Sequence, residues 1–140
     1  MAKTKKTTQV KQFVYDVTGG DSGAIGVKTL GVLPKAAVLT QAFFDVQTTF
    51  TSATDAATIA VGVTGAASAF DTAIAISNGA NPWDAGRRAA DEPTNQTVIP
   101  AALADFHAAA ATNSVFVIAT VAVEALTAGK FVLNVEYYVP

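Results

Sequence analysis

The chain has 140 residues, no Cys and a single His, and 51% of its residues are hydrophobic while only 14% are charged. A chain of this length forms one domain; the lack of Cys excludes disulfides and thiolate metal sites, and one His excludes sites that need two from the same chain. Charged residues usually make up about a quarter of a protein, so a surface this poor in charge predicts a molecule that packs against neighbours.

Positive charge is concentrated at the N-terminus. The first eleven residues contain no acid and four lysines, which are Lys3, Lys5, Lys6 and Lys11. The rest of the chain has five basic and eleven acidic residues, so we expect a basic arm over residues 1–12 in front of an acidic domain over residues 13–140. The arm lacks the apolar segment of a signal peptide. The longest apolar stretch, residues 115–126, is too short to span a membrane, and no membrane partner is expected.

Alternation of apolar and polar residues predicts strands in the first half of the chain. In chain order the predicted strands cover residues 12–17, 24–32, 37–50 and 58–63. Turn residues separate them, as in the GGDSG segment of residues 19–23. Residues 71–77 fit either a short helix or a strand, because Ile74 and Ile76 alternate while Ala favours a helix.

The second half begins with a long loop. Residues 78–93 contain two prolines, two glycines and Trp83, and loops of this length are usually functional or disordered. Residues 97–99 read as a short strand, and residues 101–111 fit a helix or an extended segment. Two final strands are predicted over residues 115–123 and 131–139, joined by a turn at residues 124–129. The first of these strands is apolar on both sides, as in a central strand covered on both faces.

The strand pattern determines the fold class. Six or seven strands with Gly, Pro and Asp between them favour an all-β protein. An α/β fold would need two or three amphipathic helices, and the sequence offers at most one. We therefore predict an antiparallel β-sandwich, jelly-roll-like, with an extended N-terminal arm.

No arrangement of residues points to catalysis, a metal or a cofactor. Asp105 and His107 would share one face of a strand, but a single Asp-x-His is more often a surface pair than a metal site. Asp91 and Glu92 are adjacent in the long loop, unlike the two separated carboxyl groups of a glycosidase. Neither a phosphate-binding loop nor a nucleophile elbow is present. We predict no enzyme activity, no cofactor and no small-molecule substrate.

Two further features of the sequence have alternative interpretations. The arm lysines could neutralise phosphates, but the acidic domain and the lack of a basic stripe interleaved with aromatics argue against nucleic-acid binding. In the 78–93 loop, Trp83 either anchors the loop to the sandwich or belongs to a contact surface. Such a surface would include the charged residues of the same loop, which are Arg87, Arg88, Asp91 and Glu92.

Three segments resemble a known family. Residues 30–39 read LGVLPKAAVL and lead into residues 42–62, AFFDVQTTFTSATDAATIAVG; near the end, LTAGKF at residues 126–131 precedes a strand closing on VEYY at residues 135–138. This order is similar to that of small tailed-bacteriophage virion proteins. In that group an LP-x-x-A-V segment enters a long strand, a polar turn follows, and a T-A-G-K hairpin precedes the last strand. The resemblance covers residues 25–63 and 120–139.

This resemblance implies a structural β-sandwich protein of the virion with no catalytic residues. Members of the group decorate capsids as cement proteins, often as trimers, or occur in head or tail fibres. Because the chain has no fibre-shaft repeat, we expect a capsid decoration protein that binds the major capsid protein on the virion surface, as a homotrimer, with the basic arm as a docking segment. The alternative is a receptor- or carbohydrate-binding module of a phage fibre that uses the Trp83 loop.

Overall fold

The computed structural model describes residues 8–35, 37–77, 83–89 and 115–139. Within these residues the chain forms eight strands and no helix. The strands are β1 (Gln9–Asp16), β2 (Gly26–Leu33), β3 (Val38–Ser52), β4 (Thr58–Val63), β5 (Ala66–Ala75), β6 (Gly86–Ala89), β7 (Val115–Ala122) and β8 (Leu126–Tyr138).

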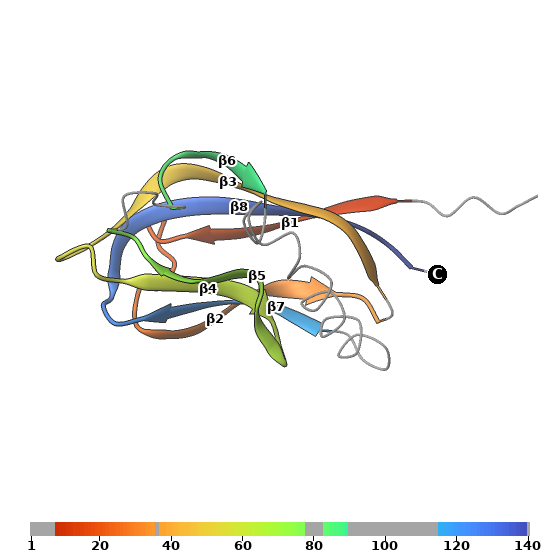
Figure 1. The fold of residues 1–140 in the computed structure, drawn as a ribbon, viewed down its shortest axis with the longest axis horizontal. Coiled ribbons are helices and arrows are strands. Elements are labelled where there is room, and N and C mark those ends of the chain that lie inside the picture. Colours follow the sequence, from red (N-terminus) through yellow and green to blue (C-terminus); the bar gives the residue numbers. More distant parts are fainter. Residues whose placement is uncertain (1–7, 36, 78–82, 90–114, 140) are drawn as a thin grey trace, which may run out of the picture.

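The strands form two four-stranded antiparallel sheets that pack face to face (Figure 1). Sheet A has the order β1-β8-β3-β6, and sheet B has the order β2-β7-β4-β5. The pairs are nested, because β1 pairs with β8, β2 with β7, β3 with β6 and β4 with β5. A long hairpin folded over itself gives this arrangement, which is the connectivity of a jelly roll. The predicted jelly-roll-like β-sandwich is therefore confirmed.

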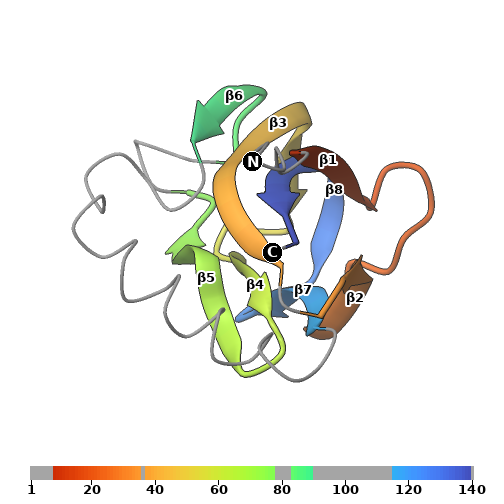
Figure 2. The same ribbon diagram turned by 90° about the vertical axis from the view of Figure 1, so that its right-hand side faces the viewer.

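Each side of the sandwich is formed by two edge strands, one from each sheet. Figure 2 shows β1 and β2 on one side and β5 and β6 on the other. On the first side Lys11 connects the sheets, since its Nζ donates a hydrogen bond to the carbonyl oxygen of Val32 at 2.6 Å. Because β1 and β2 are the edge strands of the described sheets, this side carries backbone groups that none of the eight strands pairs.

The two sheets contribute different side chains to the core. The inner face of sheet A is aromatic: the Phe44 and Phe131 ring centroids are 5.2 Å apart, and Trp83 packs against both at 5.2 Å and 5.4 Å. The inner face of sheet B is lined by smaller buried residues, which include Ile59, Val61, Val63, Val117, Ala119 and Val121. Large rings opposite small aliphatic side chains fill the space between two sheets that lie about 10 Å apart.

A glycine in β8 makes room for another core ring, that of Phe50. Gly129 has a φ of +134°, and a Cβ added there would come within 2.2 Å of the Phe50 ring. The main-chain register of β3 against β8 shifts on either side of this point. Glycine is therefore required both by the backbone conformation and by the close approach of the ring.

Several predicted boundaries differ from the structure. Residues 9–12, which we assigned to the arm, belong to β1, whose alternation continues back to Gln9. Of residues 71–77, for which we left a helix or a strand open, residues 71–75 belong to strand β5 and residues 76–77 form a turn. The turn expected at residues 124–129 is shorter, because β8 begins at Leu126 and runs through Gly129.

One strand was not predicted at all. β6 lies within the segment that we assigned to the 78–93 loop. Its sequence, GRRA, has no apolar alternation, and it forms because its backbone pairs with the edge of β3. Three predictions for the segment between β6 and β7 lie outside the described residues. They are the strand at 97–99, the helix or extended segment at 101–111, and the pair Asp105 and His107.

Candidate functional site

The first candidate site is the basic arm. Lys3, Lys5 and Lys6 lie outside the described residues, and Lys11 is part of the folded domain. Its Nζ contacts the carbonyl of Val32 and lies 5.5 Å from the centroid of the Phe13 ring. Lys11 therefore joins the edges of the two sheets, and a docking role for the arm depends on the three lysines that precede β1.

The second candidate site is the loop around Trp83, and its central residue is not on the surface. The Trp83 side chain is fully buried and packs edge-on against Phe44 and Phe50. The Trp83 carbonyl accepts a hydrogen bond from the backbone N–H of Phe50 at 3.0 Å. The expectation that Trp83 contributes to a contact surface was wrong, because the indole completes the aromatic core. The alternative, that Trp83 anchors its segment to the sandwich, is correct.

The charged residues predicted beside Trp83 are only partly described. Arg87 is exposed on the edge strand β6, opposite Asp45 of β3 in the backbone register. Arg88 pairs through its backbone with Phe44. Asp91 and Glu92 lie outside the described residues. The structure thus places Arg87 at the border of the outer face of sheet A and does not test the rest of the predicted group.

A polar cluster that the sequence did not reveal closes one end of the sandwich. Glu124, in the turn between β7 and β8, accepts hydrogen bonds from the Ser52 hydroxyl and from the backbone N–H groups of Thr54 and Ala56, at 3.0 Å and 3.2 Å. The Ser52 hydrogen bond, followed by the Thr54 backbone hydrogen bond, lowers the pKa of Glu124 to about 2. The carboxylate therefore remains ionised and holds together two turns that each connect sheet A to sheet B. Because these donors already bind the Glu124 carboxylate, we assign the cluster a role in stabilising the fold and not in binding a ligand.

A buried hydroxyl fixes the turn after β1. The hydroxyl of Tyr15 donates a hydrogen bond to the carbonyl oxygen of Ser22 at 2.6 Å. Burial, with a smaller contribution from the Asp21 carboxylate, raises the pKa of Tyr15 to about 12. The hydroxyl therefore stays protonated and keeps its hydrogen bond across the physiological pH range.

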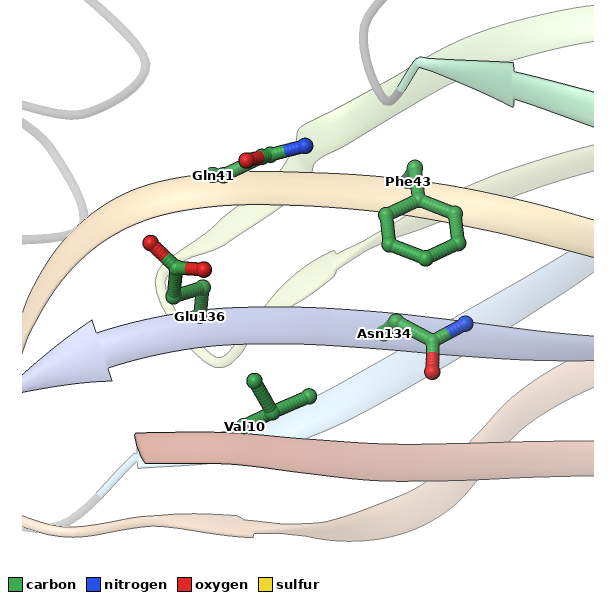
Figure 3. A pocket seen from close by; sticks show the side chains of 5 residues that line it. All are labelled: Val10, Gln41, Phe43, Asn134 and Glu136. Atoms are coloured by element: carbon green, nitrogen blue, oxygen red, sulfur yellow. The ribbon is translucent and has the colours of Figure 1, made fainter. Parts of the chain in front are cut away.

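The outer face of sheet A is polar and slightly hollowed. Figure 3 shows the hollow, which is lined by Val10, Gln41, Phe43, Asn134 and Glu136. It encloses about 270 Å³, part of which is open solvent, whereas small-molecule sites usually enclose about 300–1,000 Å³ and bury most of the ligand. The hollow is therefore too small and too open for a dedicated ligand pocket.

The outer face of sheet B is different because it is apolar and uncharged. Cross-strand pairs on this face join Val27 to Thr120, Thr29 to Ile118, and Val32 to Phe116. Exposed fractions are 61% for Val27, 37% for Val32 and 53% for Phe116. We call these six residues the sheet B patch. The expectation that both faces of β7 are covered was therefore wrong for the single chain.

The exposed apolar residues lie on both sheets and at their ends. Among the described residues, the large hydrophobic side chains that remain exposed are Val10, Val14, Ile25, Val27, Val32, Phe116, Val123 and Val139. Contiguous exposed apolar residues mark interaction surfaces, whereas scattered ones do not. Val27, Val32 and Phe116 lie on two adjacent strands, so the sheet B patch is a contiguous group.

The described residues show neither a metal-binding cluster nor a membrane-spanning helix. In the described part of the chain, no group of three or more His, Asp or Glu residues is arranged to hold a metal ion. No helix in that part is long and apolar enough to cross a membrane.

Comparison with known proteins places the fold among chains of phage capsids. No protein-family model matches the chain, and no curated protein matches its sequence. The fold is similar to a chain in the acidic stable capsid structure of Helicobacter pylori bacteriophage KHP30, with a TM-score of 0.59 and 17% identity over 97% of this chain and 91% of the other.

Two further solved structures show the same likeness. A chain in the cyanophage Pam1 capsid asymmetric unit has a TM-score of 0.59 and 20% identity, over 100% of this chain and 93% of the other. A chain in the capsid of Ralstonia phage GP4 has a TM-score of 0.58 and 17% identity, over 96% of this chain and 85% of the other. At such identities the likeness establishes the fold: this chain is a jelly-roll β-sandwich of the same architecture.

Proposed function

We propose that the chain is a non-enzymatic structural protein of a bacteriophage virion that binds the capsid as a decoration, or cement, protein. The observation that carries the proposal is a likeness of fold that extends over nearly the whole of this chain and most of each capsid chain. Both partners in each comparison are therefore small and consist of one sandwich. A single small sandwich fits an accessory component of a capsid.

The surface of the chain supports the same proposal. Only 14% of the residues are charged, and the described surface has an apolar patch on sheet B and an open hollow on sheet A. A protein that adheres to many identical neighbours gains strength from repeated contacts. The partner would be the major capsid protein, and the decorating unit would be a homotrimer on the virion surface.

The arm gives the proposal a specific docking element. Lys3, Lys5 and Lys6 precede the first strand, whereas Lys11 is held by the fold. A basic segment can bind an acidic protein surface, and such contacts weaken as salt increases.

Capsid binding is tested by co-sedimentation of the purified protein with capsids that lack it. Deletion of residues 2–7 leaves β1 intact, and we expect it to weaken binding at least about tenfold without changing the thermal unfolding midpoint. Replacing the three arm lysines with arginine should preserve binding, and replacing them with glutamine should not. A wild-type protein that does not bind capsids would refute the decoration role.

The alternative function, a receptor- or carbohydrate-binding module, loses its main support in the structure. It depended on an exposed Trp83, and the indole is completely buried. We therefore retain only the decoration role.

A further inference from the structure

The sheet B patch differs from every other face in the described part of the chain because it carries no charge. The strands of sheet B contain only two charged residues, Lys28 and Asp71. Both lie on the inner register, since Lys28 pairs with the buried Ala119 and Asp71 pairs with the buried Val61. The outer face of β2, β7 and β4 is therefore built from Val, Ile, Phe, Ala, Thr and Gly alone. On β4 the outward residue Ala60 is already buried, so the open part of this face lies over β2 and β7.

This composition is typical of the centre of a permanent contact between copies of one chain. Such interfaces are depleted of charge at their core and enriched in aromatic and aliphatic residues. The patch covers two adjacent strands of about eight residues, which measure roughly 26 Å by 10 Å. It would therefore form the apolar centre of a larger contact, since each partner in a stable interface buries ~800 Å².

We propose that the sheet B patch is the surface through which copies of this chain associate, with Thr29 and Ile118 in the middle of the patch and Val32 and Phe116 at one end of it. An uncharged face is complementary to itself, because no charge of one copy is buried against a charge of the next. Around a threefold axis, three such faces meet and each contacts its two neighbours. The inference rests on the proposed function, because the patch would be the contact between the three copies of the proposed decorating trimer.

The geometry favours contact by the face over pairing of edge strands. On the free edge of β2, the Val32 carbonyl accepts a hydrogen bond from Lys11 Nζ at 2.6 Å. Lys28 Nζ donates to the Ala24 carbonyl just before β2, also at 2.6 Å. Lysines on an edge strand hinder pairing with a further strand. The edge of β2 is thus protected while its outer face remains open.

The apolar character also favours a second copy over the capsid shell as the occupant of this patch. A decoration protein exists in solution before it meets a shell, and a large uncovered apolar face promotes aggregation. Association between copies covers the patch from the start. The polar outer face of sheet A and the basic arm then remain free for contacts that form later.

The experiment measures the oligomeric state by sedimentation velocity and light scattering over the micromolar range. We expect the wild type to be an oligomer. Phe116→Lys and Thr29→Arg each place a charge in the patch and should raise the dissociation constant about 30-fold or more. Thr29 is exposed and its replacement removes no apolar contact, so this variant keeps the test valid if Phe116→Lys does not fold. Circular dichroism and thermal unfolding confirm the fold of each variant.

The matched control is Val14→Lys, which introduces the same charge at a residue that is 43% exposed on the outer face of sheet A. It should leave the oligomer unchanged. A monomeric wild type, or Phe116→Lys and Thr29→Arg proteins that fold and remain as oligomeric as the wild type, would overturn the inference.

Capsid binding provides the readout that separates this inference from the proposed function. If the wild type forms oligomers that the patch variants disrupt but does not bind capsids, the decoration role fails and the self-contact stands. If the wild type binds capsids and the patch variants still assemble, the self-contact fails and the decoration role stands.

Discussion

The two sheets of the sandwich differ on both of their faces. Sheet A has aromatic rings inside and a polar outer face, where Gln12 donates a hydrogen bond to Asn134 at 2.9 Å. Sheet B has aliphatic side chains inside and apolar, uncharged residues outside. An antiparallel sheet with one face in water shows the first pattern, whereas a sheet covered on both faces shows the second. The comparison indicates that sheet B is built to be covered on a face that a single chain leaves open.

Two phenylalanines provide the strongest test of this comparison. Phe131 is fully buried on the inner face of sheet A, and Phe116 is 53% exposed on the outer face of sheet B. We expect Phe131→Ala to lower the free energy of unfolding by about 3–5 kcal/mol, since it removes the ring at the centre of the aromatic cluster. Phe116→Ala should cost less than about 1 kcal/mol in the dissociated chain, because more than half of the residue is exposed.

Urea denaturation in the Thr29→Arg background, where association is weakened, measures both changes. Equal losses of stability for the two variants would mean that Phe116 is part of the core of the single chain. In that case the contrast between the outer faces would disappear.

The difference between the two sheets also explains which features of the fold the sequence alone could predict. Alternation at Phe44 and Val46 predicted β3 correctly because a half-buried strand exposes its pattern directly. β7 was also predicted, but its second apolar face was assigned to burial within the chain. Periodicity indicates that a face is covered and does not say which molecule covers it. The sheet B patch could therefore be recognised only when the fold showed it uncovered.

Other features depended on contacts between distant residues. β6 has no pattern of its own and forms by pairing with β3. Glu124 lies about half the chain away from Ser52, and only the nested topology brings the two turns together. The sequence left two interpretations of Trp83 open, an anchor for the 78–93 loop or part of a contact surface, and only the fold shows that its ring is buried in the aromatic core.

Tyr15 allows a second test, on the inner face of sheet A. Its pKa is about 12 in the folded chain, against an ordinary value of 10.0. The folded state therefore favours the protonated hydroxyl. The resulting stabilisation is fully present below about pH 10 and is lost as the pH rises through about 12. A shift of this size corresponds to roughly 2–3 kcal/mol.

The control for Tyr15 is Tyr15→Phe, which keeps the ring and removes the ionisable hydroxyl. Chemical denaturation of both proteins from neutral pH to about pH 12 gives their difference in unfolding free energy. We expect the advantage of the wild type to shrink as the pH rises. A constant difference over this range would show that the hydroxyl of Tyr15 ionises equally in the folded and unfolded chains.

The smallest expected effect concerns Glu124, which holds together the crossings between the two sheets. Its pKa is about 2 in the folded chain and 4.5 ordinarily, so its stabilisation is complete above about pH 4.5 and is lost as the pH falls through about 2. Because the carboxylate lies at the surface, solvent weakens the effect.

Glu124→Gln should lower the thermal unfolding midpoint at neutral pH, and its plot of unfolding midpoint against pH should converge with that of the wild type in acid. Ser52→Ala removes the main donor and should reduce the same pH dependence. If the gap between wild type and Glu124→Gln is constant with pH, the turns are held by their backbone contacts and not by this carboxylate.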